Sequence, residues 1–161
     1  MLMNEYFLFS APLAGKSGHE AGRILLKKSY EALTGLPLPG IKTGERGKPD
    51  FSEGPWHFSI SHTPRHVFCA LCKAPIGIDA EEEDRRVSEK LPEKVLSPSE
   101  YSRYLASSDR RTALLTFWVL KEASVKFTGE GLRGYPCHTD FRLDDPRVFH
   151  RDHCLVAIIT E

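Results

Sequence analysis

The chain has 161 residues, enough for one domain with a sizeable core, and its 22 Lys and Arg residues balance 22 Asp and Glu residues. This balance argues against a basic surface for nucleic acid or membranes, so any anion site must be local. No run approaches the ~18 apolar residues of a membrane span, and the N-terminus lacks the basic start of a signal peptide. We therefore expect a cytoplasmic protein.

The first third of the chain predicts a strand, a helix and an irregular connection. Residues 4–10 suggest a short strand, and Ser17 with Glu20 has the spacing of a helix capping box. Apolar residues then recur at helical spacing up to Gly35, which suits the helix end. Four glycines and three prolines from Gly35 to Pro49 predict no regular structure there.

Three short strands follow in quick succession, and they predict an antiparallel meander. Residues 57–61, 67–72 and 76–81 have the alternation and composition of strands. The charged run over residues 81–86 is expected to be a solvated loop. Ser97, Pro98 and Glu100 then form a strong helix start, with Glu100 closing a capping box.

Residues 112–129 predict a central helix, capped by Asp109, that is apolar on nearly every side. Lys121 nevertheless falls inside its apolar stripe, with Glu122 and Lys126 on the flank. An unpaired buried charge is costly, so these residues must be paired, wet or bound to an external charge. Beyond this helix, residues 139–143 alternate in polarity and residues 154–160 predict a buried closing strand.

Asp79 and Glu81 belong to the third predicted strand and point to the same face, while its apolar residues point to the other. The simplest reading is a polar strand end, but oxygen ligands also suit Mg²⁺. A metal shared with Glu122 would leave Lys121 and Lys126 to bind phosphates. The alternative, an ion pair between Glu122 and Lys126, leaves Lys121 unexplained.

The cysteines offer a zinc alternative, through Cys69-x-x-Cys72 together with Cys137-His138 and His153-Cys154. Residues three apart in a strand point to opposite faces, however, so Cys69 and Cys72 could not share one ion there. We expect these cysteines to be reduced core residues.

Five motifs in order carry a family resemblance, and P-loop, Rossmann and serine-hydrolase motifs are absent from the sequence. The motifs are GKPDF from Gly47, FSISHT from Phe58, IGIDAE from Ile76, SPSEY from Ser97 and FWVLKEASVKFTGEGL from Phe117. Over roughly residues 44–132 the chain resembles the Sfp-type 4′-phosphopantetheinyl transferases of the holo-acyl-carrier-protein synthase superfamily.

The resemblance implies a transferase that moves the 4′-phosphopantetheine arm of coenzyme A to a serine of an acyl or peptidyl carrier protein. Mg²⁺ would assist, and 3′,5′-ADP would leave. The implied metal ligands are Asp79, Glu81 and Glu122, and the implied catalytic residues are Glu122, as base for the carrier serine, and Lys126. The implied coenzyme-binding residues are Arg23, Lys48, Pro49, Ser61, His62, Lys121 and Lys126. Glu100 matches an acidic family position near the pantetheine, although the helix cap alone explains it.

The implied fold is α+β, with antiparallel sheets packed on long helices and two halves related by a pseudo-twofold. Only 46 residues precede Gly47, so we expect a shortened N-terminal half. We expect one domain over residues 1–161, with lobes over 1–75 and 76–161, acting as a monomer without nucleic acid or membrane partners. Arg85, Arg86, Arg110 and Arg111 are candidate contacts to an acidic carrier.

Two other functions fit the same residues. A non-catalytic protein of this fold would bind coenzyme A or a nucleotide without transfer. A Mg²⁺-dependent hydrolase of small phosphoesters or anhydrides would release phosphopantetheine or ADP with no carrier present.

Overall fold

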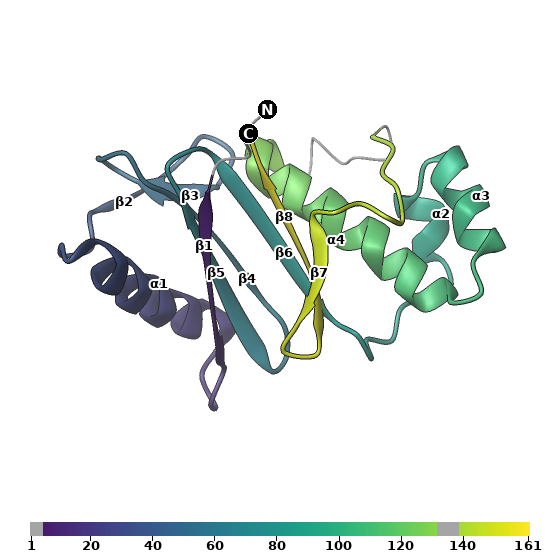
Figure 1. Ribbon diagram of the computed structural model, residues 1–161, viewed down its shortest axis with the longest axis horizontal. Helices are drawn as coiled ribbons and strands as arrows, with labels where there is room; N and C mark the ends of the chain where they lie inside the picture. Colours follow the sequence, from purple (N-terminus) through teal and green to yellow (C-terminus); the bar gives the residue numbers. More distant parts are fainter. Residues whose placement is uncertain (1–4, 132–138) are drawn as a thin grey trace.

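The computed structural model describes residues 5–131 and 139–161 (Figure 1). The strands in this part of the chain are β1 (Tyr6–Pro12), β2 (Ile41–Thr43), β3 (Pro49–Phe51), β4 (His57–His62), β5 (His66–Cys72), β6 (Ile76–Glu82), β7 (Val148–Arg151) and β8 (Cys154–Thr160). The helices are α1 (Gly18–Thr34), α2 (Leu91–Val95), α3 (Pro98–Ala106) and α4 (Arg110–Thr128). Within the described ranges, no helix has the length and apolar content needed to cross a membrane.

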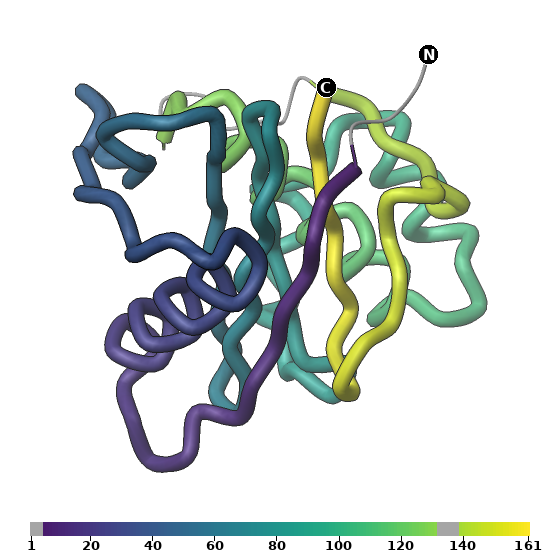
Figure 2. The backbone as a smooth tube through the Cα atoms, turned by 60° about the vertical axis from the view of Figure 1, so that its left-hand side comes forward, coloured from purple at the N-terminus to yellow at the C-terminus, as the bar shows by residue number. Residues whose placement is uncertain are grey.

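Two three-stranded antiparallel sheets lie between α1 and α4. The first has the order β1-β5-β4 and the second the order β6-β8-β7, while β2 and β3 form a separate hairpin. Helix α1 packs on the first sheet and α4 on the second. In Figure 2, α1 lies on one side of β1, and the yellow C-terminal strands lie on the other side. The mixture of helices and antiparallel sheets agrees with the predicted α+β class.

The alternation of the strands builds a core between the two sheets. Every second residue of β5, β6 and β8 faces this core: Phe68, Ala70, Cys72, Ile76, Ile78, Ala80, Cys154, Val156 and Ile158. The intervening residues of β5 pack with α1, and those of β8 pack with α4. The prediction for β6 is therefore confirmed, because its apolar residues enter the core while Asp79 and Glu81 take the opposite face, toward α4.

Serine hydroxyls join the two sheets along the seam between β4 and β6. The Ser59 hydroxyl accepts a hydrogen bond from the Ile78 amide at 3.1 Å, and the Ser61 hydroxyl accepts one from the Ala80 amide at 3.1 Å. Both serines are buried. The residue numbers rise together on the two strands, so β4 and β6 run side by side in the same direction. Buried amides of β6 thus find acceptors without strand pairing.

Helix α4 is fixed at both ends and lies very close to β6. Asp109 accepts a hydrogen bond from the Thr112 amide at 3.1 Å, and Gly129 ends the helix at a φ of 70°. Gly77 faces the helix, where a Cβ atom would lie 2.1 Å from the Ala123 carbonyl oxygen. Only glycine allows this approach, which brings the next residues of β6 against the charged side chains of α4.

The helix boundaries predicted from capping residues are confirmed. Ser17 accepts a hydrogen bond from the Glu20 amide at 3.1 Å, and Gly35 ends α1 in the left-handed conformation. Ser97 and Glu100 form both halves of a capping box at the start of α3. Local hydrogen bonding therefore sets these boundaries as expected.

The predicted meander is wrong, because β6 pairs with β8 and not with β5. Strands β1 and β4 occupy both edges of β5, so β6 begins a second sheet, which shares a buried core with the first. Residues 35–49 were expected to be irregular, yet β2 pairs there with β3, and Gly47 supplies a φ of 88° in the turn. Strand β7 was not predicted, and residues 139–143 form no strand in the structure as described.

The charged run over residues 81–86 is not a fully solvated loop, because β6 extends to Glu82 and this side chain is buried. Its carboxylate accepts a hydrogen bond from Thr63 at 2.5 Å and two from the Arg65 guanidinium at 2.9 and 2.5 Å. Desolvation disfavours the charged form of Glu82, but these hydrogen bonds outweigh it and lower the pKa.

The three cysteines within the described residues are free and buried, as expected. Cys69 packs on the α1 side of β5 and Cys72 on the side of the second sheet, so they cannot share one ion. Burial raises the pKa of Cys69 to about 12 and that of Cys154 to about 11, which keeps both thiols protonated at neutral pH. Cys137 and His138 lie outside the described residues.

Candidate functional site

Asp79 lies at the centre of a charged site between β6, β4 and α4. Its Oδ1 accepts hydrogen bonds from the Ser61 hydroxyl at 3.1 Å and from Lys126 Nζ at 2.8 Å. Its Oδ2 is buried and has no hydrogen-bond partner among the described residues. A buried carboxylate oxygen without a donor is costly, and a cation at this position would satisfy it.

Glu81 lies two residues further along the same face of β6 and already holds two partners. Its Oε1 accepts a hydrogen bond from the Trp118 indole at 2.9 Å and forms an ion pair with Arg85. The Arg85 guanidinium also lies 5.9 Å from the centre of the Trp118 ring. Arg85 and Trp118 thus both hold Oε1 of Glu81 and fix the direction of this carboxylate.

Glu122 projects from α4 into the electrostatic field of these acids. Burial raises the pKa of Glu122 and of Glu81, the nearby Asp79 charge raises both further, and Arg85 and Lys126 partly oppose the shift. Asp79 repels both glutamates, so the three carboxylates would gain from a shared cation. A set made only of oxygen atoms suits Mg²⁺. The residues present therefore fit the ion.

The carboxylate oxygens of Asp79, Glu81 and Glu122 lie further apart than the ligand atoms of a single bound ion. Among the residues that the structure covers, only His66, Glu82 and Cys154 bring three potential ligand atoms within 4.8 Å of one another. Glu81 is turned toward Arg85 and Trp118, so binding of one ion by all three acids requires side-chain movement.

Two cavities give the site access to solvent. One, of about 250 Å³, is lined by Lys48, Pro49 and Lys126 among others. The other, of about 900 Å³, is lined by Glu81 and His62 together with the start of α1. Glu81 and Lys126 therefore each border a different cavity.

The larger cavity has a lining of mixed charge. Lys16, Arg65, Arg85 and Arg86 line it, but Arg65 is paired with Glu82 and Asp84, and Arg85 with Glu81, in the same wall. His62 and Gly18, which lies in the first turn of α1, line it as well. A Cβ atom on Gly18 would lie 2.3 Å from Cγ of His62, so the ring lies against the helix start. Free amides at a helix N-terminus and basic side chains together favour a bound anion.

Comparison with known proteins identifies the family of this arrangement. The model of the 4′-phosphopantetheinyl transferase superfamily matches residues 75–156, which include β6, α4 and the start of β8. The chain belongs to the 4′-phosphopantetheinyl transferase superfamily.

Three relatives illustrate the extent of the similarity. The chain is 33% identical over 116 residues to the 4′-phosphopantetheinyl transferase psf-1 of Bacillus pumilus, covering 69% of this chain and 49% of psf-1. It is 40% identical over 95 residues to Sfp of Bacillus subtilis, covering 57% and 42% of the two chains. It is 34% identical over 114 residues to AcpT of Salmonella typhi, covering 68% and 57%. The chain thus spans about half the length of the curated relatives it matches.

Four residues predicted from the 4′-phosphopantetheinyl transferase motifs come together. Asp79, Glu81, Glu122 and Lys126 influence one another electrostatically, and Lys126 contacts Asp79 directly. His62 lines the cavity beside Glu81. Ser61 is buried and hydrogen-bonded to Asp79, so it supports the carboxylate and does not line either cavity.

Lys121 was expected to need an external anion, and that premise is wrong because the protein supplies one. Its Nζ lies 2.8 Å from Oε2 of Glu100 and donates a hydrogen bond to the Thr139 carbonyl at 3.0 Å. The side chains of Lys121 and Glu100 are 2% and 0% exposed. Glu100 therefore acts as a helix cap and as a buried counter-charge.

The remaining predicted coenzyme residues are scattered. The Lys48 amine donates hydrogen bonds to the carbonyls of Ile76 and Phe127, both at 3.2 Å, and burial lowers its pKa. It ties the β2–β3 hairpin to β6 and to the end of α4, while Pro49 beside it lines the smaller cavity. Arg23 is half-buried on α1 and lines neither cavity.

Sequence reasoning missed the roles of Arg85 and Trp118 at Glu81. Arg85 had been considered only as a contact for a carrier protein, and Trp118 only as part of the largely apolar helix over residues 112–129. The four-residue spacing of Glu81 and Arg85 indicates a contact only within a helix, and here a strand end and a turn bring them together. The contact of Trp118 with Glu81 joins α4 to β6, so it depends on packing that the sequence does not show.

Proposed function

We propose that the chain transfers the 4′-phosphopantetheine arm of coenzyme A to a serine of a carrier protein. The observation that carries the proposal is the position of Asp79. Its Oδ1 holds Lys126 at 2.8 Å, and its unpartnered Oδ2 lies in the field of two further acids. Acids for a cation and a lysine for a phosphate thus occur side by side.

In the proposed reaction the serine oxygen attacks the phosphorus that bears the pantetheine arm. A bond forms between these two atoms, the pyrophosphate bond to that phosphorus breaks, and 3′,5′-ADP leaves with the bridging oxygen. Glu122 takes the serine proton. Burial and the charge of Asp79 raise the pKa of Glu122, which makes it a stronger base than an exposed glutamate.

Basic residues would orient the coenzyme along the two cavities. Lys126 would hold the pyrophosphate from one side and His62 from the other, since each lines a different cavity. Lys48 and Pro49 would shape the adenine end, and Arg23 would meet the 3′-phosphate. Lys121 is left out of this set, because its charge is neutralised by Glu100 inside the protein.

Asp79, Glu81 and Glu122 would hold Mg²⁺. When bound, this ion supplies charge neutralisation for the pyrophosphate. Without the metal ion, Arg85 neutralises the charge of Glu81. Binding of the metal ion by Glu81 would replace this ion pair.

We propose the carrier-binding surface around a further cavity of about 720 Å³, which Arg86, Arg110 and Arg111 line. Carrier proteins are typically acidic, so a basic cavity close to Glu81 suits the approach of the serine. The single domain over residues 1–161, the cytoplasmic location and the monomeric state stay predictions.

The decisive test is incubation of the chain with coenzyme A, Mg²⁺ and several apo carrier proteins. Mass spectrometry should find the added phosphopantetheine on the carrier serine, and a carrier with alanine at that serine should gain no mass. Calorimetric binding of coenzyme A without transfer to any carrier would support the non-catalytic alternative. Release of phosphopantetheine without a carrier would support hydrolysis.

The Glu122→Gln variant tests the proposed base. We expect transfer to be lost while the circular dichroism spectrum and the Tm stay close to those of the parent. Glu53→Gln, at an exposed turn, is the matched control and should transfer normally. Near-normal transfer by Glu122→Gln would remove Glu122 from the mechanism.

A further inference from the structure

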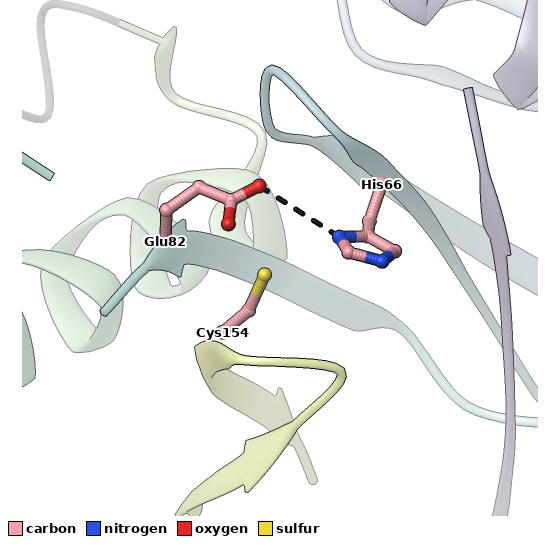
Figure 3. A group of neighbouring side chains, drawn as sticks. All are labelled: His66, Glu82 and Cys154. Carbon is pink, nitrogen blue, oxygen red and sulfur yellow. Dashed lines mark ion pairs between the residues drawn. The ribbon is translucent and has the colours of Figure 1, made fainter. Parts of the chain in front are cut away.

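Three metal-ligating side chains meet on the face of β6 that is turned away from Asp79. His66 comes from β5, Glu82 from β6 and Cys154 from β8, and Figure 3 shows the three side chains pointing toward one another. One ligand atom from each lies within 4.8 Å of the other two. No other group of this kind occurs in residues 5–131 and 139–161.

The strand pattern explains why these residues meet. Every second residue of the three strands faces the core between the sheets, and His66, Glu82 and Cys154 continue these three rows at one end. Glu82 and Cys154 are also direct partners in the pairing of β6 with β8. The paired strands β6 and β8 thus hold two of the side chains, and β5, in the facing sheet, holds the third.

The distances and donor types suit a tetrahedral zinc site. Zinc binds imidazole nitrogen at about 2.0 Å, carboxylate oxygen at about 2.0–2.2 Å and thiolate sulfur at about 2.3 Å, so tetrahedral ligand atoms lie roughly 3.3–3.7 Å apart. His66 Nδ1 lies 3.7 Å from Oε1 of Glu82. One nitrogen, one oxygen and one sulfur atom favour zinc over Mg²⁺, which prefers oxygen alone.

An unsatisfied atom points to a missing ligand. His66 Nδ1 is buried and has no hydrogen-bond partner among the described residues, although Glu82 lies near it. The Glu82 carboxylate is in turn oriented by Thr63 at Oε1 and by Arg65 at Oε2. Such outer hydrogen bonds are a regular feature of metal sites, and Oε1 keeps a second lone pair for an ion.

We propose that His66, Glu82 and Cys154 bind one zinc ion, which links the two sheets at the end of their shared core. The cavity of about 900 Å³ that Thr63 and Glu82 line gives an entry path and room for water as the fourth ligand. This ion would be separate from the Mg²⁺ of the proposed transfer reaction, because Glu82 and Asp79 point to opposite faces of β6. Binding must displace the thiol proton of Cys154.

The test uses the full chain, freed of metal by a chelator and titrated with Co²⁺ and then Zn²⁺. We expect one Co²⁺ per chain, with the thiolate-to-cobalt charge-transfer absorption in the ultraviolet, and displacement by Zn²⁺ but not by Mg²⁺. Saturating Zn²⁺ at about 100 times Kd should raise the Tm by about 5–10 °C. These readouts do not depend on transferase activity, so they can fail or succeed independently of the proposed function.

Variants assign the ligands. Cys154→Ser should abolish the charge-transfer absorption, whereas Cys72→Ser, at a buried cysteine of the same core, should retain it. His66→Gln changes a side chain that is 22% exposed, so it should fold even if Cys154→Ser does not, and it should weaken Zn²⁺ binding at least about tenfold.

Three results would overturn the proposal. They are the absence of stoichiometric binding, charge-transfer absorption that survives Cys154→Ser, and unchanged Zn²⁺ affinity in a folded His66→Gln variant. The first would leave His66, Glu82 and Cys154 as neighbouring side chains that share no ion.

Discussion

Replacement of Lys121 by methionine tests whether this lysine serves the fold or the coenzyme. Methionine keeps the length and the apolar stem of the side chain but removes the ammonium group. Glu100 then keeps its hydrogen bonds from the Ser97 amide at 2.9 Å and the Phe141 amide at 2.8 Å, but it loses its buried counter-charge.

The expected cost follows from the burial of both partners. Removal of one member of a buried ion pair costs about 3–5 kcal/mol of unfolding free energy. For a chain of this size each kcal/mol lowers the Tm by about 2–4 °C, so Lys121→Met should lower it by about 6–20 °C. Lys94→Met, at an exposed lysine on α2, is the matched control and should change the unfolding free energy by less than about 0.5 kcal/mol.

Chemical denaturation of the single variants Lys121→Met and Glu100→Gln and of the double variant measures the coupling. We expect the double variant to lose less than the sum of the two single losses, by about 1–3 kcal/mol, because no unpaired charge remains. Coenzyme A affinity, measured at a temperature where all variants are folded, should fall far more in Lys126→Met than in Lys121→Met. A stable Lys121→Met variant that binds coenzyme A poorly would refute the reasoning.

Three further changes test the seam and the strand that carries the acids. Gly77→Ala should cost about 3 kcal/mol in thermal unfolding, because the new methyl group meets the Ala123 carbonyl, which cannot rotate away; a cost below about 1 kcal/mol would show that β6 can shift. Ser61→Ala should cost about 1–3 kcal/mol in urea unfolding, since a buried β6 amide loses its acceptor, and no change would mean that water replaces the hydroxyl. Glu82 has a lowered pKa when folded, so unfolding free energy should fall as the pH drops from the ordinary glutamate pKa through the folded one. Arg65→Met should flatten that part of the pH profile, and an unchanged profile would remove this ion pair from the pH dependence.

Features set by one short segment were predictable from the sequence. The alternation that separates Asp79 and Glu81 from the apolar residues of β6 is a property of the strand itself. The caps at Ser97 and Asp109 likewise depend on residues three positions away. These predictions needed no knowledge of how the chain packs.

Features set by distant segments were not predictable. The capping box explained Glu100 locally, so nothing indicated that the crossing of α3 and α4 also pairs it with Lys121. Strand β6 pairs with β8, whose partner residue for Ile76 is Thr160, far along the chain. The cluster of His66, Glu82 and Cys154 depends on both sheets. The zinc alternative from the sequence included Cys154 but neither His66 nor Glu82.

The hydroxyl-bridged seam also bears on solubility. Strands β4 and β6 are the outer strands of their sheets, and an exposed outer strand offers unpaired backbone groups to other chains. Here each outer strand covers the other, and Ser59 and Ser61 fill the space that a third backbone would need. A substitution that separates β4 from β6 would expose the unpaired backbone groups of both strands at once. We therefore expect such a variant to aggregate and not only to unfold.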